Sequence, residues 1–146
     1  MAPKYKQSLP LRGKTKNYVF AVGRRRSAIA RVRLFKGEEE NTVNGQVVGK
    51  YFQGDTFGFA WNKPFEVTET LGKYYFTARV VGGGKNGQLD AIVLGISRTL
   101  VKMKDGAEQR KVLKKAGLMT RDSRIRERRK MGMGGKARRK KQSPKR

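Results

Sequence analysis

The chain has 146 residues, of which 36 are Lys or Arg and 11 are Asp or Glu, so its formal net charge is +25 at pH 7. It contains no cysteine and no histidine, which excludes disulfide frameworks, thiolate or imidazole metal sites, and Cys or His nucleophiles. No apolar run approaches the roughly 20 residues of a membrane-spanning helix. This charge favours nucleic acid as the partner, because phosphates release counterions when Lys and Arg replace them.

The charge is concentrated toward the two ends of the chain. Residues 1–37 carry a net charge of +11, residues 38–101 carry −1 and residues 102–146 carry +15. A nearly neutral middle between cationic ends predicts a folded body with basic extensions that bind nucleic acid. The predicted parts are a basic flexible leader over residues 1–16, a globular body over residues 17–120 and an extended basic tail over residues 121–146.

The leader is basic and contains no acidic residue. Pro3, Pro10 and Gly13 oppose regular structure within it. It lacks the apolar region of a secretory signal, and its bias toward lysine argues against an organelle-targeting segment. We therefore expect a cytoplasmic protein in preference to an organellar one.

Two β-strands are predicted after the leader. In residues 18–22 and 28–35, apolar side chains recur at the two-residue period of a strand. Residues 23–27 lie between them and include three consecutive arginines, which cannot all point into a core. Either the arginines form a solvated strand end or they contact phosphate, and the charge of the chain favours phosphate.

The middle of the chain predicts further strands. Asn44-Gly45 is flanked by β-forming residues, which indicates a hairpin with a type I′ turn. Strands are also predicted over residues 64–70 and 73–81, and the region between the hairpin and these strands is expected to be irregular. Its aromatic residues could stack on bases, but we favour core filling in so small a domain. They are Tyr51, Phe52, Phe57, Phe59 and Trp61.

Two helices are predicted toward the end of the body. The apolar stripe of the first, which should lie on the sheet, is Leu89, Ile92, Val93, Ile96 and Leu100. The second spans about residues 107–116 and is expected to turn Val112, Leu113 and Ala116 inward, with Gly117 as its C-terminal cap. In the turn that follows, we expect Asp122 to pair with a neighbouring arginine.

The glycine-rich segment at residues 82–88 resembles a nucleotide-binding loop only superficially. A Walker-type loop would need Lys and Ser or Thr where Gln88 and Leu89 stand. The dinucleotide fingerprint would need a preceding βαβ half and an acidic ribose ligand, which the sequence does not supply. We therefore predict no nucleotide cofactor, and we expect the glycines to allow close packing of strand against helix.

The tail holds thirteen Lys or Arg against two acidic residues. A segment with this charge density repels itself and buries too little apolar area to offset the ordering entropy. It can order only against a polyanion, so we predict that it threads into folded RNA. Glycines at Gly132, Gly134 and Gly135 would let it bend between RNA helices.

Several of these stretches, in this order and spacing, resemble one family. They are GRRRSAIARV at 23–32, VNG at 43–45, YF at 51–52, GGGKNGQ at 82–88, AI at 91–92, LGI at 94–96, LKKAG at 113–117, TRDSR at 120–124, ERRK at 127–130, KARR at 136–139 and the terminal KR. The chain is similar, over roughly residues 17–146, to the small-subunit ribosomal protein S-nine family in its bacterial type. No single motif is specific, but their combination is.

The resemblance implies the fold. The family has an α+β body with a four-stranded sheet, helices on one face, and a long extended basic C-terminal tail. This body is grouped with the second domain of ribosomal protein S-five, whose left-handed βαβ crossover runs against the general rule. The resemblance also implies a protein that is not an enzyme and has no catalytic residue, cofactor or metal.

The resemblance further implies a structural constituent of the small ribosomal subunit. Such a protein binds 16S-type rRNA of the subunit head (the 3′ major domain) and neighbouring ribosomal proteins. It binds no membrane, has no small-molecule substrate and forms no homo-oligomer. Its tail approaches the anticodon stem of P-site tRNA, which implies that Lys145 and Arg146 are the tRNA-proximal residues. The implied rRNA ligands are Arg24, Arg25, Arg26, Arg31, Arg121, Arg124, Arg126, Arg128, Arg129, Lys130, Lys136, Arg138, Arg139, Lys140 and Lys141.

The tip departs from the family pattern. Bacterial members usually end in Gln-aromatic-Ser-Lys-Arg, whereas this chain ends in Gln142-Ser143-Pro144-Lys145-Arg146. The aromatic residue is lost, and Pro144 fixes φ and removes an amide donor. Two alternative functions fit the composition: a free RNA chaperone, which would bind unrelated RNAs equally well, and a histone-like compacting protein, which would usually offer a dimer face.

Overall fold

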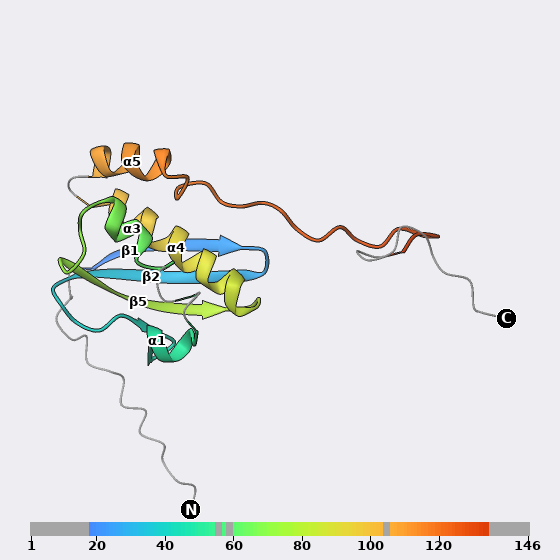
Figure 1. Cartoon of the computed structure of the whole chain (residues 1–146), viewed down its shortest axis with the longest axis horizontal. Coiled ribbons are helices and arrows are strands. Elements are labelled where there is room, and N and C mark those ends of the chain that lie inside the picture. Colours follow the sequence, from blue (N-terminus) through green and yellow to red (C-terminus); the bar gives the residue numbers. More distant parts are fainter. Residues whose placement is uncertain (1–17, 55–56, 58–59, 104–105, 135–146) are drawn as a thin grey trace, which may run out of the picture.

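One five-stranded sheet organises the part of the chain that the computed structural model describes, residues 18–54, 57, 60–103 and 106–134 (Figure 1). The strand order is β1-β2-β5-β3-β4. Three strands are long, β1 (Val19–Arg25), β2 (Ala28–Lys36) and β5 (Tyr74–Val81), and two are short, β3 (Thr42–Val43) and β4 (Gln46–Val47). The expected α+β class is confirmed. The expected four-stranded sheet was wrong, because both arms of the Asn44-Gly45 hairpin join the sheet as a fourth and a fifth strand.

β1 and β2 form an antiparallel hairpin whose pairing runs from Val19↔Leu34 to Arg25↔Ala28. Both predicted strands are confirmed, and β1 continues through Gly23, Arg24 and Arg25. The turn places Arg26 in the left-handed region, with φ of 50°. The second predicted hairpin is also confirmed, with φ of 51° at Asn44 and 81° at Gly45, as a type I′ turn requires.

β5 pairs antiparallel with β2 and parallel with β3. The connection from the β3–β4 hairpin to β5 includes two short helices, α1 (Val48–Tyr51) and α3 (Lys63–Val67). The predicted strand over residues 64–70 was therefore wrong. Pro64 stands in the first turn of α3, where its missing N–H leaves no hydrogen bond unmade. The Thr68 hydroxyl then donates to the Pro64 carbonyl at 2.8 Å and closes the segment as a turn.

The long helix α4 (Lys85–Val101) lies on one face of the sheet, against β1 and β2 (Figure 1). Its predicted apolar stripe is confirmed, because Leu89, Ile92, Ile96 and Leu100 are buried and Val93 is half-buried. The helix also covers the outer edge of β1: Arg98 Nη1 donates to the Val22 carbonyl at 2.7 Å. No helix in the described ranges has the length and apolarity to cross a membrane.

The final helix, α5 (Gly106–Lys115), packs against α3 and α4. Only one of its three predicted inward residues faces the core: Leu113 is fully buried, whereas Val112 is 45% exposed and Ala116 is exposed. A ten-residue helix at the margin of the domain presents a narrow buried stripe to its neighbours. The predicted cap is confirmed, since Gly117 has φ of 74° and the Leu118 amide returns to the Leu113 carbonyl.

Aromatic residues fill the core, as predicted for those the structure describes. Phe52 is buried, and Tyr51, Phe57 and Trp61 pack against the buried cluster. Phe59 lies outside the described residues. These rings pack within the domain, as expected for core filling.

The glycine-rich loop packs against the β1–β2 turn. Gly82 has φ of 75°, and a Cβ there would lie 2.5 Å from the Ser27 carbonyl oxygen. At the start of α4, the Lys85 ammonium lies 3.4 Å from the centre of the Tyr51 ring and donates to the Tyr51 carbonyl. The loop thus needs glycine for close packing, although its closest neighbour is the turn between two strands, not the expected strand–helix contact.

Candidate nucleic-acid interface

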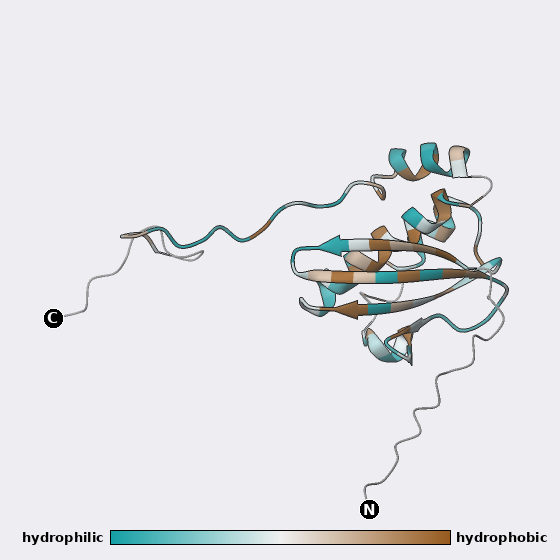
Figure 2. Cartoon of the chain, turned by 180° about the vertical axis from the view of Figure 1, so that it is seen from behind, coloured by the Kyte–Doolittle hydropathy of each residue, from teal (hydrophilic) through white to brown (hydrophobic). Residues whose placement is uncertain are grey.

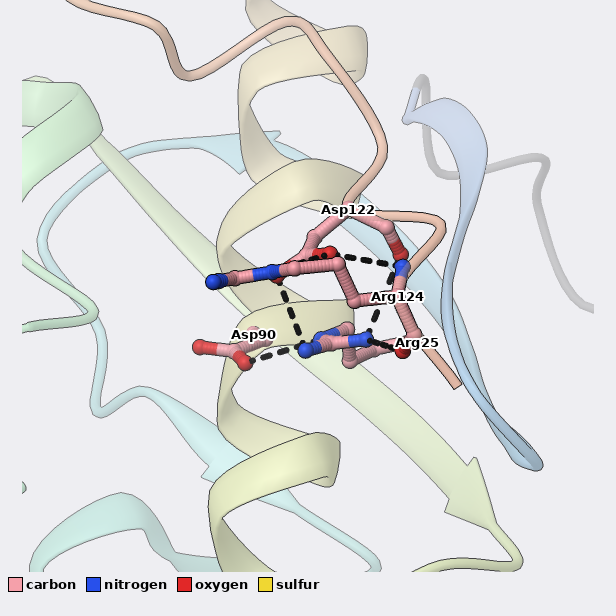
Figure 3. Close-up of polar contacts among 4 residues, drawn as sticks. All are labelled: Arg25, Asp90, Asp122 and Arg124. Atoms are coloured by element: carbon pink, nitrogen blue, oxygen red, sulfur yellow. Dashed lines mark hydrogen bonds and ion pairs between the residues drawn. The ribbon is translucent and has the colours of Figure 1, made fainter. Parts of the chain in front are cut away.

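A cluster around Arg25 joins three separate segments of the chain (Figure 3). The Arg25 side chain points inward from the end of β1 and is only 8% exposed. Its Nη2 lies 2.8 Å from Asp122 Oδ2, and its Nε lies 3.5 Å from Asp90 Oδ2 on α4. Its Nη1 donates to the Arg124 carbonyl at 2.6 Å. We call Arg25, Asp90, Asp122 and Arg124 the Arg25 latch, because they tie the start of the C-terminal segment to the body.

Within the latch, Asp122 pairs with Arg124 as the sequence predicts. Arg124 Nη2 lies 2.7 Å from Oδ2, and Arg124 Nε donates to both carboxylate oxygens at 3.1 Å. The Arg124 backbone N–H also donates to Oδ1 at 2.9 Å. These hydrogen bonds from Arg124, with the Arg25 charge as a smaller contribution, hold the pKa of Asp122 well below its usual value.

We expect the Asp122 carboxylate to stay charged at a pH where an ordinary aspartate, with a pKa of about 3.9, is already half neutralised. Because its pKa is lowered in the folded state, the latch contributes stability above that ordinary pKa and loses it as pH falls through the lowered pKa. A carbon-13 NMR titration of the Asp122 carboxyl checks this. In an Arg124→Gln chain the midpoint should rise toward 3.9, whereas Arg121→Gln should not move it. An unshifted midpoint in the unaltered chain would contradict the latch.

The structure separates the predicted body ligands into two groups. Arg24, Arg26 and Arg31 are exposed, with Arg24 and Arg31 projecting from the sheet and Arg26 standing in the turn. Arg25, predicted as an RNA ligand like its neighbours, is buried and engaged by two carboxylates and two carbonyls. A phosphate cannot reach its guanidinium while the latch is closed, because strand alternation directs Arg25 to the helix-covered side with Ala21 and Gly23.

The C-terminal segment from Arg121 onward, which includes two residues of the latch, is rich in exposed basic side chains. Residues 121–130 form neither helix nor strand. The exposed predicted ligands here are Arg121, Arg124, Arg126, Arg128, Arg129 and Lys130. Lys130 pairs with Glu127 at 2.8 Å, a solvent-exposed ion pair of the kind that adds little stability. The other predicted ligands, Lys136, Arg138, Arg139, Lys140, Lys141, Lys145 and Arg146, lie outside the described residues.

Sequence reasoning missed the latch as a unit. It predicted a local Asp122–Arg pair but not the contact with Arg25, which lies 97 residues away in the chain. The sequence did contain one indication that Arg25 points inward. Ala21, Gly23 and Arg25 alternate along the strand and so share one face, and the first two are small enough to lie under a helix. Among the described residues, no three His, Cys, Asp or Glu side chains gather as a metal site would need.

Comparison with known proteins connects this architecture to one family. The family model described as ribosomal protein S9/S16 matches residues 23–146. A relative from Maridesulfovibrio salexigens (strain ATCC 14822 / DSM 2638 / NCIMB 8403 / VKM B-1763), the small ribosomal subunit protein uS9, is 43% identical over 121 residues. The matched region covers 83% of this chain and 92% of the relative. The residues that the family model matches include the exposed arginines of the body, the latch and the basic segment that follows.

Proposed function

Because the chain belongs to the ribosomal protein S9/S16 family, whose members are structural and non-enzymatic components of the small ribosomal subunit, we propose that it binds the rRNA of the subunit head. The proposed contacts are made by its exposed arginines and by its C-terminal segment. A ribosomal protein has rRNA and neighbouring ribosomal proteins as its partners. We propose that this one enters the subunit as a single copy in the cytoplasm, without a membrane or a small-molecule substrate.

The observation that carries the proposal is the Arg25 latch at the root of the basic segment. The latch determines where the segment leaves the body, and Arg126, Arg128 and Arg129 follow it as exposed cations. Arginine forks bind phosphate bidentately, and lysine adds a compact point charge. Such contacts set the position and shape of RNA without reading its sequence. The proposed mechanism is therefore an anchored cationic tail that extends between rRNA helices and neutralises their phosphates.

The ligand assignment follows from this mechanism. We propose that Arg24, Arg26 and Arg31 contact rRNA from the body, and that the basic residues of the tail contact it along their length. Arg25 acts through the latch, which positions the tail. At the tip, Lys145 and Arg146 would supply positive charge to the anticodon stem of P-site tRNA, a contribution of about 1–2 kcal/mol from charge-assisted hydrogen bonds.

Sedimentation of a cell extract through sucrose at roughly 0.5 M salt tests the proposal, because this salt strips loosely held basic proteins. We expect the chain to migrate stoichiometrically with the small subunit. Migration at the top of the gradient would reject a constitutive role, and equal affinity for unrelated RNAs would favour an RNA chaperone. A chain lacking Lys145 and Arg146 should still join the subunit but should weaken P-site tRNA binding; unchanged tRNA binding would reject the role of the tip.

A further inference from the structure

On the side of the sheet opposite α4, which Figure 2 shows from behind with the strands in front, the three long strands carry a row of arginines. We call this surface the open face; it consists of the side chains of β1, β2 and β5 that alternate with the buried ones. Its arginines are Arg24 on β1, Arg31 and Arg33 on β2, and Arg79 on β5, all of them exposed. The three strands contain no Asp or Glu, so every charged side chain that they contribute to this face is cationic.

Two of these arginines stand directly opposite each other. In the β2–β5 register Arg31 pairs with Arg79, and Arg33 lies one step along the same face of β2. Like charges directly opposite on adjacent strands destabilise a sheet. Within the described residues, no carboxylate forms an ion pair with Arg31, Arg33 or Arg79. The fold therefore tolerates a repulsion that an anion bound between these side chains would relieve.

Three of these arginines, Arg31, Arg33 and Arg79, line a hollow of about 800 Å³. Phe20 and Thr77 also line it, and the β3–β4 hairpin forms its rim. The rim is firmly held, because the Asn44 side chain donates to the Val80 carbonyl at 3.1 Å and accepts from the Val80 amide at 2.8 Å. The hollow is thus a built feature of the sheet surface and large enough for a backbone segment of a polymer.

Exposed aromatic rings border the arginines. Tyr18 is 45% exposed and Phe20 is 42% exposed. The Arg33 guanidinium lies 5.2 Å from the centre of the Tyr18 ring. Cationic grooves with bordering aromatic rings suit nucleic acid, since the arginines bind the phosphates and the rings contact bases. The carboxylates of an acidic protein segment would match only the arginines, whereas a nucleic acid matches the arginines with its phosphates and the rings with its bases.

We propose that the open face is an rRNA-binding surface distinct from the tail, in which Arg33 and Arg79 join Arg31 in binding one stretch of phosphate backbone. This inference rests on the proposed function and adds Arg33 and Arg79 to the ligands. The body would then be held on RNA through its sheet as well as through its tail. The two surfaces are separable, because the latch and tail residues are not part of the open face.

The first test uses the full chain and protein-free small-subunit rRNA. An Arg33→Gln, Arg79→Gln chain should bind roughly tenfold more weakly, and the salt dependence of log K should lose about 1.4–1.8 units for two phosphate contacts. Its resistance to urea should be equal or higher, because removing Arg79 relieves the repulsion from Arg31. The matched control, Lys63→Gln with Lys73→Gln, removes the same charge from exposed positions elsewhere and should keep the salt slope within about 0.5 unit. Equal slopes for the two variants would overturn the inference.

A second test maps the surface directly. The chain has no cysteine, so Val81→Cys places a unique thiol on the open face at a position that is 67% exposed. rRNA alone should slow alkylation of this thiol at least tenfold, whereas Leu71→Cys should react as fast as in the free chain. Protection only in the complete subunit would identify a protein neighbour and overturn the RNA assignment. Absence of rRNA binding by the unaltered chain would instead reject the proposed function itself.

Discussion

A Gly23→Ala chain is expected to lose about 3 kcal/mol or more of its unfolding free energy, a large part of the roughly 5–15 kcal/mol typical of a domain. A Cβ at Gly23 would lie 1.8 Å from the Ala91 carbonyl oxygen and 2.6 Å from the Gly95 amide nitrogen. Both atoms belong to the backbone of α4 and cannot rotate away, so the helix would have to retreat from β1. In urea denaturation the midpoint should fall by about 1.5 M, for a slope of about 2 kcal/mol per M.

Two further glycines provide graded controls. A Cβ at Gly95 would lie 2.5 Å from Val32 Cγ2, a side-chain atom that can shift, so Gly95→Ala should cost less than Gly23→Ala. Gly49 lies in α1 with open space around it, and Gly49→Ala should be neutral or stabilising by up to about 1 kcal/mol. Equal midpoints for Gly23→Ala and Gly49→Ala would show that the β1–α4 contact is not as close as described.

Neutralising three tail arginines is expected to weaken rRNA binding roughly a hundredfold at about 0.1 M salt. The variant is Arg126→Gln, Arg128→Gln and Arg129→Gln, which leaves the latch intact. Each arginine that contacts a phosphate contributes about 0.7–0.9 to the salt dependence of log K, so the slope should fall by about 2.1–2.7. The measurement is a binding titration of the full chain with small-subunit rRNA at several salt concentrations.

The matched control removes three charges from the nearly neutral part of the chain. Lys50, Lys63 and Lys73 are exposed, and their replacement with glutamine lowers the net charge by the same amount. If binding depends only on net charge, both variants will lose the same slope, and the anchored tail will have no special role. If the control keeps most of the slope, the tail acts as the principal phosphate-binding segment.

The elements with strong local patterns were predictable from the sequence. The alternation of Ala28, Ala30, Val32 and Leu34 indicated β2, and Asn44-Gly45 indicated the β3–β4 hairpin. Each of these patterns depends only on residues that are neighbours in the chain. The prediction failed at residues 64–70, where β-forming residues follow Pro64 and become a short helix. It also failed at Val112, whose exposure follows from the position of α5 on the domain and not from helical periodicity.

The candidate interface was predictable in composition and less so in arrangement. The sequence alone established where the positive charge is concentrated, that the middle folds and that Asp122 would pair locally, since these follow from residue types and short spacings. Only the tertiary structure showed that Arg25 turns inward and meets Asp122, and that Arg31 stands opposite Arg79. The physical reason is that these contacts join residues that are far apart in the chain. Strand register brings Arg31 opposite Arg79, and the segment that follows α5 brings Asp122 to the end of β1; no local pattern encodes either arrangement.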